Sequence, residues 1–398
     1  MSTEEGAVRS PWITVWFSPR RTIERLVANR PTYFVWPLAI LGTVASIYNQ
    51  ISVIYNASYL FDWQLALCLV LFGAVAGIIW LYLAGFVLSR IGRLLGGHAR
   101  AIDLRAAFAW SALPTIAGFA LILVIDAVTG RGDALDIVPL LVAGFTLWSF
   151  VVFLLMLGRV ERFGVFRTIL TYLLNLALGL VAALFIRSFL FQPFNIPSGS
   201  MRPTLFVGDY IFVSKYAYGY GRFSLPYASS TASGRIFSKE PARGDVVVFR
   251  VPKDRVDYVK RVVGLPGDRI QMKGGELFVN DVPVKRERLA DVEGQDACGS
   301  PTRGQVKRWR ETLPDGASYD TLDCLDNGPN DDTGVFTVPP GHFFALGDNR
   351  DNSTDSRTQS VGYIPFDNLI GRVGLIFFSR KDGAPAHVRF KRIGTVVR

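Results

Sequence analysis

The sequence predicts a membrane α-helical N-terminal part followed by an all-β, mainly antiparallel domain outside the membrane. Half of the 398 residues are hydrophobic and the mean hydropathy is +0.28, which is too apolar for a wholly soluble chain of this length. The long apolar segments all lie before residue 190. After residue 194 the chain consists of short β-branched and aromatic runs separated by Gly, Pro and Asp.

Five segments in the first half have the length and near-absence of charge that a bilayer-spanning helix needs. They cover residues 33–55, 63–89, 107–125, 137–158 and 168–189. Pro114 interrupts the third, which is therefore the weakest of the five. We predict about four transmembrane helices in a membrane domain, 1–165, and a fifth helix, 166–193, that anchors the remainder.

Arginines alternate between the loops in the way that cytoplasmic retention predicts. They precede the first span and lie between spans two and three and between spans four and five: Arg20, Arg21, Arg25, Arg30, Arg90, Arg93, Arg100, Arg105, Arg159, Arg162 and Arg167. The other two loops carry only Arg131. We expect a multi-pass protein of the cytoplasmic (inner) membrane with a cytoplasmic N-terminus and an extracytoplasmic C-terminal domain. Topology then accounts for much of the net charge of +10, and nucleic-acid binding is not predicted.

The β-rich domain is expected over 194–398, with insertions at about 222–243 and 291–334. Cys68 falls inside the second predicted span, where a cysteine usually packs as a small apolar residue. Cys298 and Cys324 both fall in the predicted extracytoplasmic region, which is an oxidising place in bacteria. They are a candidate disulfide, with two unpaired thiols as the alternative.

A candidate serine nucleophile follows the last apolar segment, at Ser200 within residues 197–205, PSGSMRPTL. A serine hydroxyl needs a neighbouring base. The histidines are poor candidates, because His98 is predicted to be cytoplasmic and neither His342 nor His387 lies in a polar cluster. Lys260 lies in an apolar β run, and burial there would lower its pKa toward that of a general base. The alternative is a solvated surface lysine.

Four ordered motifs then resemble bacterial type I signal peptidase (leader peptidase) over about 167–398. They are 197–205 with Gly208 and Asp209, 243–249 (RGDVVVF), 258–268 (YVKRVVGLPGD) and 347–357 (GDNRDNSTDSR). The resemblance implies that Ser200 is the acylated nucleophile, that Lys260 is the general base, and that the Ser200 N–H and Ser198 hydroxyl form the oxyanion hole. It further implies that Ser353 orients the lysine and that Asp355 and Arg357 brace the site. A turn salt bridge without a catalytic part is the alternative for the last two.

The same resemblance implies as substrates exported precursor proteins whose signal peptides end in a small-x-small site. Apolar side chains beside the two catalytic positions match residues that line the family's substrate pockets, with ordinary core packing as the alternative: Phe194, Ile196, Met201, Leu205, Tyr258 and Val259. Membrane lipid and the secretion machinery are further expected partners. The sequence shows no metal or cofactor motif, and this chemistry needs none.

The N-terminal part departs from the family, whose members usually carry fewer spans. Residues 10–23, SPWITVWFSPRRTI, followed by four spans, resemble the multispanning Yip-type membrane domain. These spans hold almost no ionisable residue at depth, which favours an anchor or docking platform over a transporter. Two other functions remain as alternatives: a Ser/Lys membrane protease with a narrow dedicated substrate, and a catalytically silent membrane scaffold.

Overall fold

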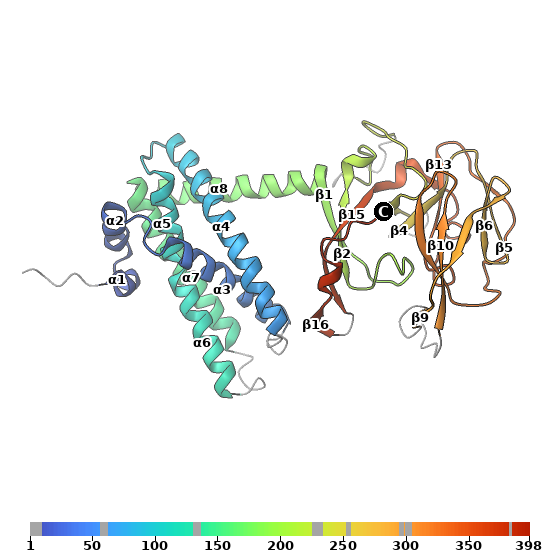
Figure 1. Ribbon diagram of the computed structural model, residues 1–398. Helices are drawn as coiled ribbons and strands as arrows, with labels where there is room; N and C mark the ends of the chain where they lie inside the picture. Colours follow the sequence, from blue (N-terminus) through green and yellow to red (C-terminus); the bar gives the residue numbers. More distant parts are fainter. Residues whose placement is uncertain are drawn as a thin grey trace, which may run out of the picture. The chain divides into compact units, whose positions relative to one another are not determined.

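The computed structural model describes residues 10–55, 63–129, 137–224, 234–251, 256–293, 298, 305–381 and 384–398. The chain forms two compact units, Met1–Val181 and Ala182–Arg398. The first unit is helical and the second is built of β-strands (Figure 1). This matches the fold class that the sequence predicts.

The helical unit contains two short helices before the long ones, which hydropathy alone did not predict. The helices are α1 (Pro11–Phe17), α2 (Pro19–Asn29), α3 (Val35–Tyr55), α4 (Trp63–Leu94), α5 (Ala101–Ser111), α6 (Leu113–Thr129), α7 (Val138–Glu161) and α8 (Val165–Phe185). A proline opens both α1 and α2, where its missing N–H costs no helical hydrogen bond. Trp110 of α5 lies at the centre of this unit's largest apolar cluster, against Trp12, and donates to the Tyr33 carbonyl at 3.0 Å.

Four helices in the described part of the chain are long and apolar enough to cross a membrane. They cover Leu69–Leu94, Ala101–Ile125, Val138–Glu161 and Val165–Leu190. Helix α3 coincides with the first predicted span, 33–55, but the side chains of its last five residues lie outside the described part. Membrane anchoring is therefore supported, and a fifth span remains a prediction.

Two predicted helix boundaries differ from the structure. The third apolar segment begins at Ala101 rather than 107 and is broken at Ala112 between α5 and α6, because Pro114 fits only within the first turn of a new helix. The fifth helix, predicted to extend to 193, ends at Leu190 after a π-helical turn, η2 (Ile186–Leu190). Strand β1 (Phe191–Asn195) begins there, since Pro193 pushes the residue before it toward an extended conformation.

The β-rich unit is organised around one eight-stranded antiparallel sheet. Its order is β1-β2-β15-β3-β4-β13-β14, with β16 on β15. These strands are β2 (Asp209–Ser214), β3 (Val246–Arg250), β4 (Asp257–Gly264), β13 (His342–Leu346), β14 (Ile364–Pro365), β15 (Leu369–Lys381) and β16 (Ala384–Val388). Strand β3 is buried on both faces: Val246 and Val248 pack in one apolar cluster, and Val247 and Phe249 in another. The sheet therefore provides a rigid base for the residues on neighbouring β4.

Two smaller four-stranded sheets complete the unit. One has the order β12-β5-β6-β7 and contains β12 (Phe336–Thr337), β5 (Arg269–Lys273), β6 (Glu276–Val279) and β7 (Val282–Pro283). The other pairs β10 with β8, β9 and β11 and contains β8 (Lys285–Arg288), β9 (Val292–Glu293), β10 (Gln305–Thr312) and β11 (Ser318–Asp323). Short 3-10 helices η3 (Lys215–Ala217), η5 (Phe366–Asn368) and η6 (Phe390–Arg392) connect strands.

The two predicted insertions have different outcomes. The segment 291–334 contains the β10–β11 hairpin, in which Arg310 and Arg308 both pair with Asp320, so it is part of a sheet rather than an irregular excursion. A disulfide joins Cys298 to Cys324 beside this hairpin, with Cα atoms 5.9 Å apart. The centre of 222–243, residues 225–233, lies outside the described part of the chain.

Candidate active site

Ser200 lies on a turn between β1 and β2, and hydrogen bonds hold this turn at both ends and in the middle. Where the turn leaves and rejoins the sheet, Ile196 N donates to the Asp209 carbonyl at 2.8 Å and Gly208 N donates to the Ile196 carbonyl at 2.9 Å. In the middle, Asn349 donates its N–H to the Ser200 carbonyl at 3.1 Å and its side-chain amide to the Gly199 carbonyl at 3.2 Å. The serine is therefore held by a segment almost 150 residues further along the chain.

Lys260 projects from β4 to this serine. Its Nζ donates to Ser200 Oγ at 2.7 Å and to the Val259 carbonyl at 3.1 Å. The two side chains are nearly inaccessible, because Lys260 is 4% and Ser200 is 8% exposed. Within the described residues, Ser200 Oγ has Lys260 and Ser198 as its hydrogen-bonding neighbours, and no histidine is among them.

Burial lowers the pKa of Lys260 to about 8. The carboxylates of Asp355 and Asp348 act in the opposite direction, and the positive charge of Arg357 adds to the lowering. At this pKa a substantial fraction of the side chain is a neutral amine near pH 8. Such an amine, within hydrogen-bonding distance of a hydroxyl, can accept its proton.

Two hydrogen-bond donors lie beside Ser200 Oγ. Ser198 Oγ is 3.4 Å from Ser200 Oγ. The backbone N–H of Ser200 forms no hydrogen bond within the described residues. Both groups are therefore available to an oxygen placed next to Ser200 Oγ, as an oxyanion hole requires.

Asp355 and Arg357 form a buried bidentate pair under the site. Arg357 Nε and Nη2 donate to the two Asp355 carboxylate oxygens at 2.9 and 2.8 Å, and Gly347 N adds a third donor at 3.0 Å. Burial would raise the pKa of Asp355, but the Arg357 guanidinium and these hydrogen bonds outweigh it and hold that pKa below its usual range. The carboxylate stays ionised and its charge reaches Lys260.

Ser353 lies in the same cluster, and among the described residues it forms no hydrogen bond with the lysine. Among the described residues, Lys260 Nζ donates to Ser200 and Val259 and not to Ser353. A Cβ at Gly347 would collide with the Ser353 side chain and with the Ser200 carbonyl oxygen, so glycine is required for this close approach. The expected orienting role of Ser353 stays a prediction.

A second buried ion pair supports the site and was missed in the sequence. Arg261, the residue after Lys260, donates Nε and Nη2 to the Asp348 carboxylate at 2.8 and 2.7 Å, and both side chains are 1% exposed. Thr204 on the serine turn donates to the same carboxylate. Asp348, Asn349 and Gly347 all belong to the motif 347–357, so that motif was the available signal for them.

The predicted pocket residues separate into two groups. Ile196, Met201 and Leu205 are at most 4% exposed and belong to a core cluster, which favours core packing for these three. Phe194 and Val259 are half-buried at the edge of that cluster, and Tyr258 at the edge of the neighbouring one. The half-buried group contains the better candidates for substrate contact.

Comparison with known proteins gives matches to both units. A family model described as signal peptidase, peptidase S26, matches residues 169–378, and a Yip1 domain model matches residues 13–186. The signal peptidase I of Rickettsia typhi is 42% identical over 208 residues, covering 50% of this chain and 76% of the relative. That of Rickettsia prowazekii is 41% identical over 216 residues, covering 52% and 79%. A crystal structure of a signal peptidase I from Enterococcus faecalis matches 34% of this chain and 97% of its own at 25% identity and a TM-score of 0.21.

Proposed function

The chain belongs to the signal peptidase family, peptidase S26, and is a signal peptidase I type serine endopeptidase; from this premise we propose that Ser200 and Lys260 are its catalytic dyad. The observation that carries the proposal is the 2.7 Å hydrogen bond between Lys260 Nζ and Ser200 Oγ, made by two nearly inaccessible side chains. Burial disfavours the charged form of the lysine, and a neutral amine within hydrogen-bonding distance of a serine hydroxyl is the arrangement that a general base requires.

The reaction follows from this pair. Neutral Lys260 accepts the Ser200 proton while Ser200 Oγ bonds to the scissile carbonyl carbon, and the resulting oxyanion is bound by the Ser200 N–H and the Ser198 hydroxyl. Collapse of the tetrahedral intermediate breaks the C–N bond, and the lysine ammonium returns its proton to the leaving amine. Water, deprotonated by the same lysine, then attacks the ester carbonyl carbon; the C–Oγ bond breaks, the lysine ammonium returns its proton to Ser200 Oγ, and the acyl fragment leaves as a carboxylic acid.

The substrates of this proposal are exported precursors cleaved after small-x-small sites at the outer face of the cytoplasmic membrane. Strand β1 lies at one end of the eight-stranded sheet, where an extended peptide can add by main-chain hydrogen bonds. Phe194 on that strand, with Tyr258 and Val259 beside Lys260, would supply shallow apolar contacts. Ser353, Asp355 and Arg357 would hold the lysine in place and set its charge. The secretion machinery and the lipid of the outer leaflet would deliver the substrate.

The test uses the full chain purified in detergent and a precursor with an Ala-x-Ala site. Ser200→Ala and Lys260→Ala are expected to abolish cleavage, whereas Ser318→Ala and Lys285→Ala, exposed residues of the same types on β11 and β8, keep it. Equal cleavage by wild type and Ser200→Ala would refute the mechanism. Wild-type activity on some precursors only would indicate a narrow dedicated substrate, and inactivity on all would indicate a scaffold.

A further inference from the structure

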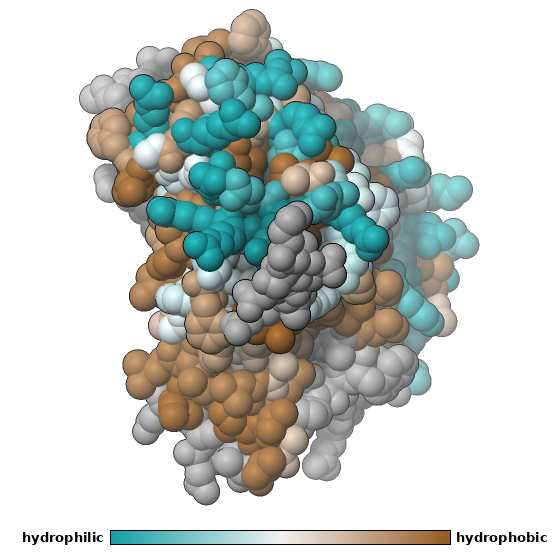
Figure 2. All heavy atoms as spheres, turned by 90° about the vertical axis from the view of Figure 1, so that its left-hand side faces the viewer, coloured by the Kyte–Doolittle hydropathy of each residue, from teal (hydrophilic) through white to brown (hydrophobic). Residues whose placement is uncertain are grey.

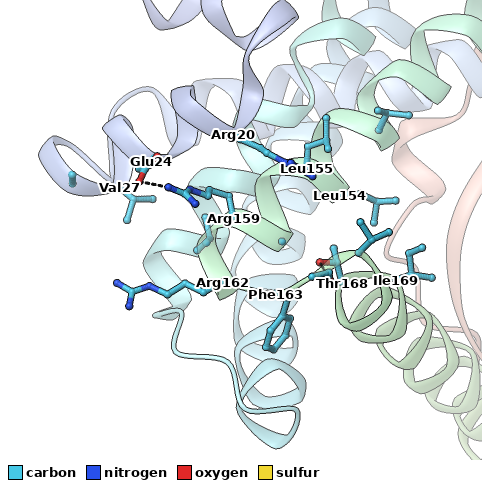
Figure 3. Close-up of a pocket in the computed structure, with 16 residues that line it drawn as sticks. Arg20, Glu24, Val27, Leu154, Leu155, Arg159, Arg162, Phe163, Thr168 and Ile169 are labelled. Carbon is cyan, nitrogen blue, oxygen red and sulfur yellow. Dashed lines mark hydrogen bonds and ion pairs between the residues drawn. The ribbon is translucent and has the colours of Figure 1, made fainter.

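The helical unit contains a cavity that the proposed proteolysis does not use. It has a volume of about 1000 Å³ and lies between α2, the end of α7 and the beginning of α8 (Figure 3). All of its lining residues fall between Arg20 and Ile169, inside the first compact unit. The cavity is separate from the residues around Ser200.

The rim of the cavity is positively charged. Arg20 on α2, Arg159 at the end of α7 and Arg162 just after it contribute three guanidinium groups, and Glu24 is the acidic residue of the lining. Arg159 is tied to Glu24 by a 2.5 Å ion pair. Arg20 and Arg162 are exposed and have no ion-pair partner among the described residues. In Figure 3 the Arg162 side chain extends outward from the rim.

The wall of the cavity is apolar. Leu154 and Leu155 of α7, Phe163 of the connecting turn and Ile169 of α8 are among its lining residues (Figure 3). Ile169 is 42% exposed, and Leu173 and Leu174 further along the same candidate span are exposed too, so an apolar surface continues from the cavity along α8. A free anion such as phosphate would use the rim and leave this wall in contact with water. A ligand that has both an anionic group and a hydrocarbon chain fits the whole cavity.

The cavity also lies at the level where two membrane-capable helices end. One candidate span ends at Glu161 and the next begins at Val165, so the turn between them is at headgroup depth. Helix α2 packs Ile23 and Leu26 into the core cluster of this unit and leaves its arginines exposed. Figure 2 views the side of this unit that carries α1 and α2, where hydrophilic side chains gather next to a hydrophobic area.

We propose that this cavity binds one anionic glycerophospholipid. Its phosphate would contact Arg20 and, once its exposed side chain turns inward from the rim, Arg162, and one acyl chain would lie along Leu154, Leu155 and Ile169. The turn between α7 and α8 lies at one surface of the membrane, and the lipid comes from the leaflet at that surface. Basic cavities between membrane helices are typical sites for such headgroups. The bound lipid would fasten the amphipathic α2 to the turn between α7 and α8.

The experiment is native mass spectrometry of the full chain in detergent with phosphatidylglycerol or with phosphatidylcholine of the same acyl chains. Wild type is expected to retain phosphatidylglycerol preferentially. Arg20→Gln/Arg162→Gln is expected to weaken this binding about 30-fold, from the usual contribution of two arginines at a membrane surface. The matched control Arg21→Gln/Arg167→Gln removes the same charge from exposed positions of α2 and α8 outside the lining and should bind nearly as wild type.

Two further measurements distinguish a bound lipid from a bound free anion. Ile169→Asn should weaken binding of long-chain phosphatidylglycerol and leave a short-chain, water-soluble form unaffected, because only the long chain reaches the wall. Inorganic phosphate at millimolar concentration should not displace the lipid. The proposal would be overturned if both lipids are retained equally, if the control variant loses as much binding, or if phosphate displaces the lipid. It would also be overturned if Arg20→Gln/Arg162→Gln binds as wild type and has the same unfolding temperature.

Discussion

Lys260 and Arg261 are adjacent basic residues on β4 whose pKa values are shifted in opposite directions. Both are buried, at 4% and 1% exposed. Burial lowers the pKa of Lys260 to about 8. Burial would lower the pKa of Arg261 too, but the charge and hydrogen bonds of Asp348 outweigh it and raise that pKa above its ordinary value. Burial alone therefore does not decide the charge of a group in this sheet.

The difference arises from the partners on the two faces of the strand. Successive side chains of a strand point to opposite faces, so the two cations meet different surroundings. Arg261 faces a carboxylate that accepts two of its hydrogen bonds, and its Nη1 also donates to the Gly244 carbonyl at 2.7 Å. Lys260 faces a hydroxyl and a carbonyl, and Asp355, the carboxylate that acts on it most strongly, is already paired with Arg357. A neutral partner leaves the lysine free to lose its proton.

Lys260→Arg is the strongest test of this comparison. Arginine keeps the positive charge but does not deprotonate in proteins, so the variant has no base at Ser200. We expect kcat/KM for a precursor peptide to fall by about 100- to 10,000-fold, the usual contribution of a positioned general base. Retention of the wild-type rate would show that the lysine acts only as a positive charge.

Arg261→Met should damage stability rather than chemistry. It leaves the Asp348 carboxylate buried without its partner, which typically costs about 3–5 kcal/mol. Thermal unfolding of the full chain in detergent, followed by circular dichroism, measures the loss. The control is Arg310→Met, which breaks the ion pair between the half-exposed Arg310 of β10 and Asp320 of β11; because Asp320 keeps its pair with Arg308, the unfolding temperature should change little. Similar losses in the two variants would mean that burial of the pair is unimportant.

Sequence motifs pointed to Ser200 and Lys260, and the resemblance also named Ser353, Asp355 and Arg357, but no pattern predicted the pairing of Arg261 with Asp348 or the contact of Asn349 with the serine turn. Ser200 and Lys260 each lie in a short motif, and hydropathy located the long helices because lipid constrains every residue of a span in the same way. The pairing of Arg261 with Asp348 joins residues 87 positions apart, and a strand pattern does not name such a partner. The hydrogen bonds from Asn349 to the Ser200 turn were missed for the same reason, because they too join residues far apart in the sequence.

Two structural elements were missed because contacts between distant residues, rather than a local sequence pattern, stabilise them. The β10–β11 hairpin carries several charged side chains, whose cross-strand pairs such as Arg310 with Asp320 stabilise it without the apolar alternation that marks a strand. Helices α1 and α2 are too short to give a span signal, and their apolar residues contact Trp110 only after the chain has folded. In both cases the element is stabilised by contacts between residues that are far apart in the sequence.

Asp355→Asn is the mildest test, because it changes the electrostatics of the lysine while keeping the dyad. If the neutral amine is the active form, wild-type kcat/KM should fall about tenfold per pH unit below a midpoint near 8. The Asp355 carboxylate raises the pKa of Lys260 and Arg357 lowers it, so removing the carboxylate and unpairing the arginine both act downward. The midpoint of the variant should therefore move to lower pH, even where its stability and maximal rate are reduced.

The matched control for this shift is Asp320→Asn, which removes a carboxylate paired with arginines on the β10–β11 hairpin. Its midpoint should equal that of wild type, because Asp320 is not among the charges that act on Lys260. A midpoint that stays constant or rises in Asp355→Asn would mean that the titrating group is not Lys260. The comparison with Arg261 would then no longer bear on function, because the lowered pKa of Lys260 could not explain the proposed activation of Ser200.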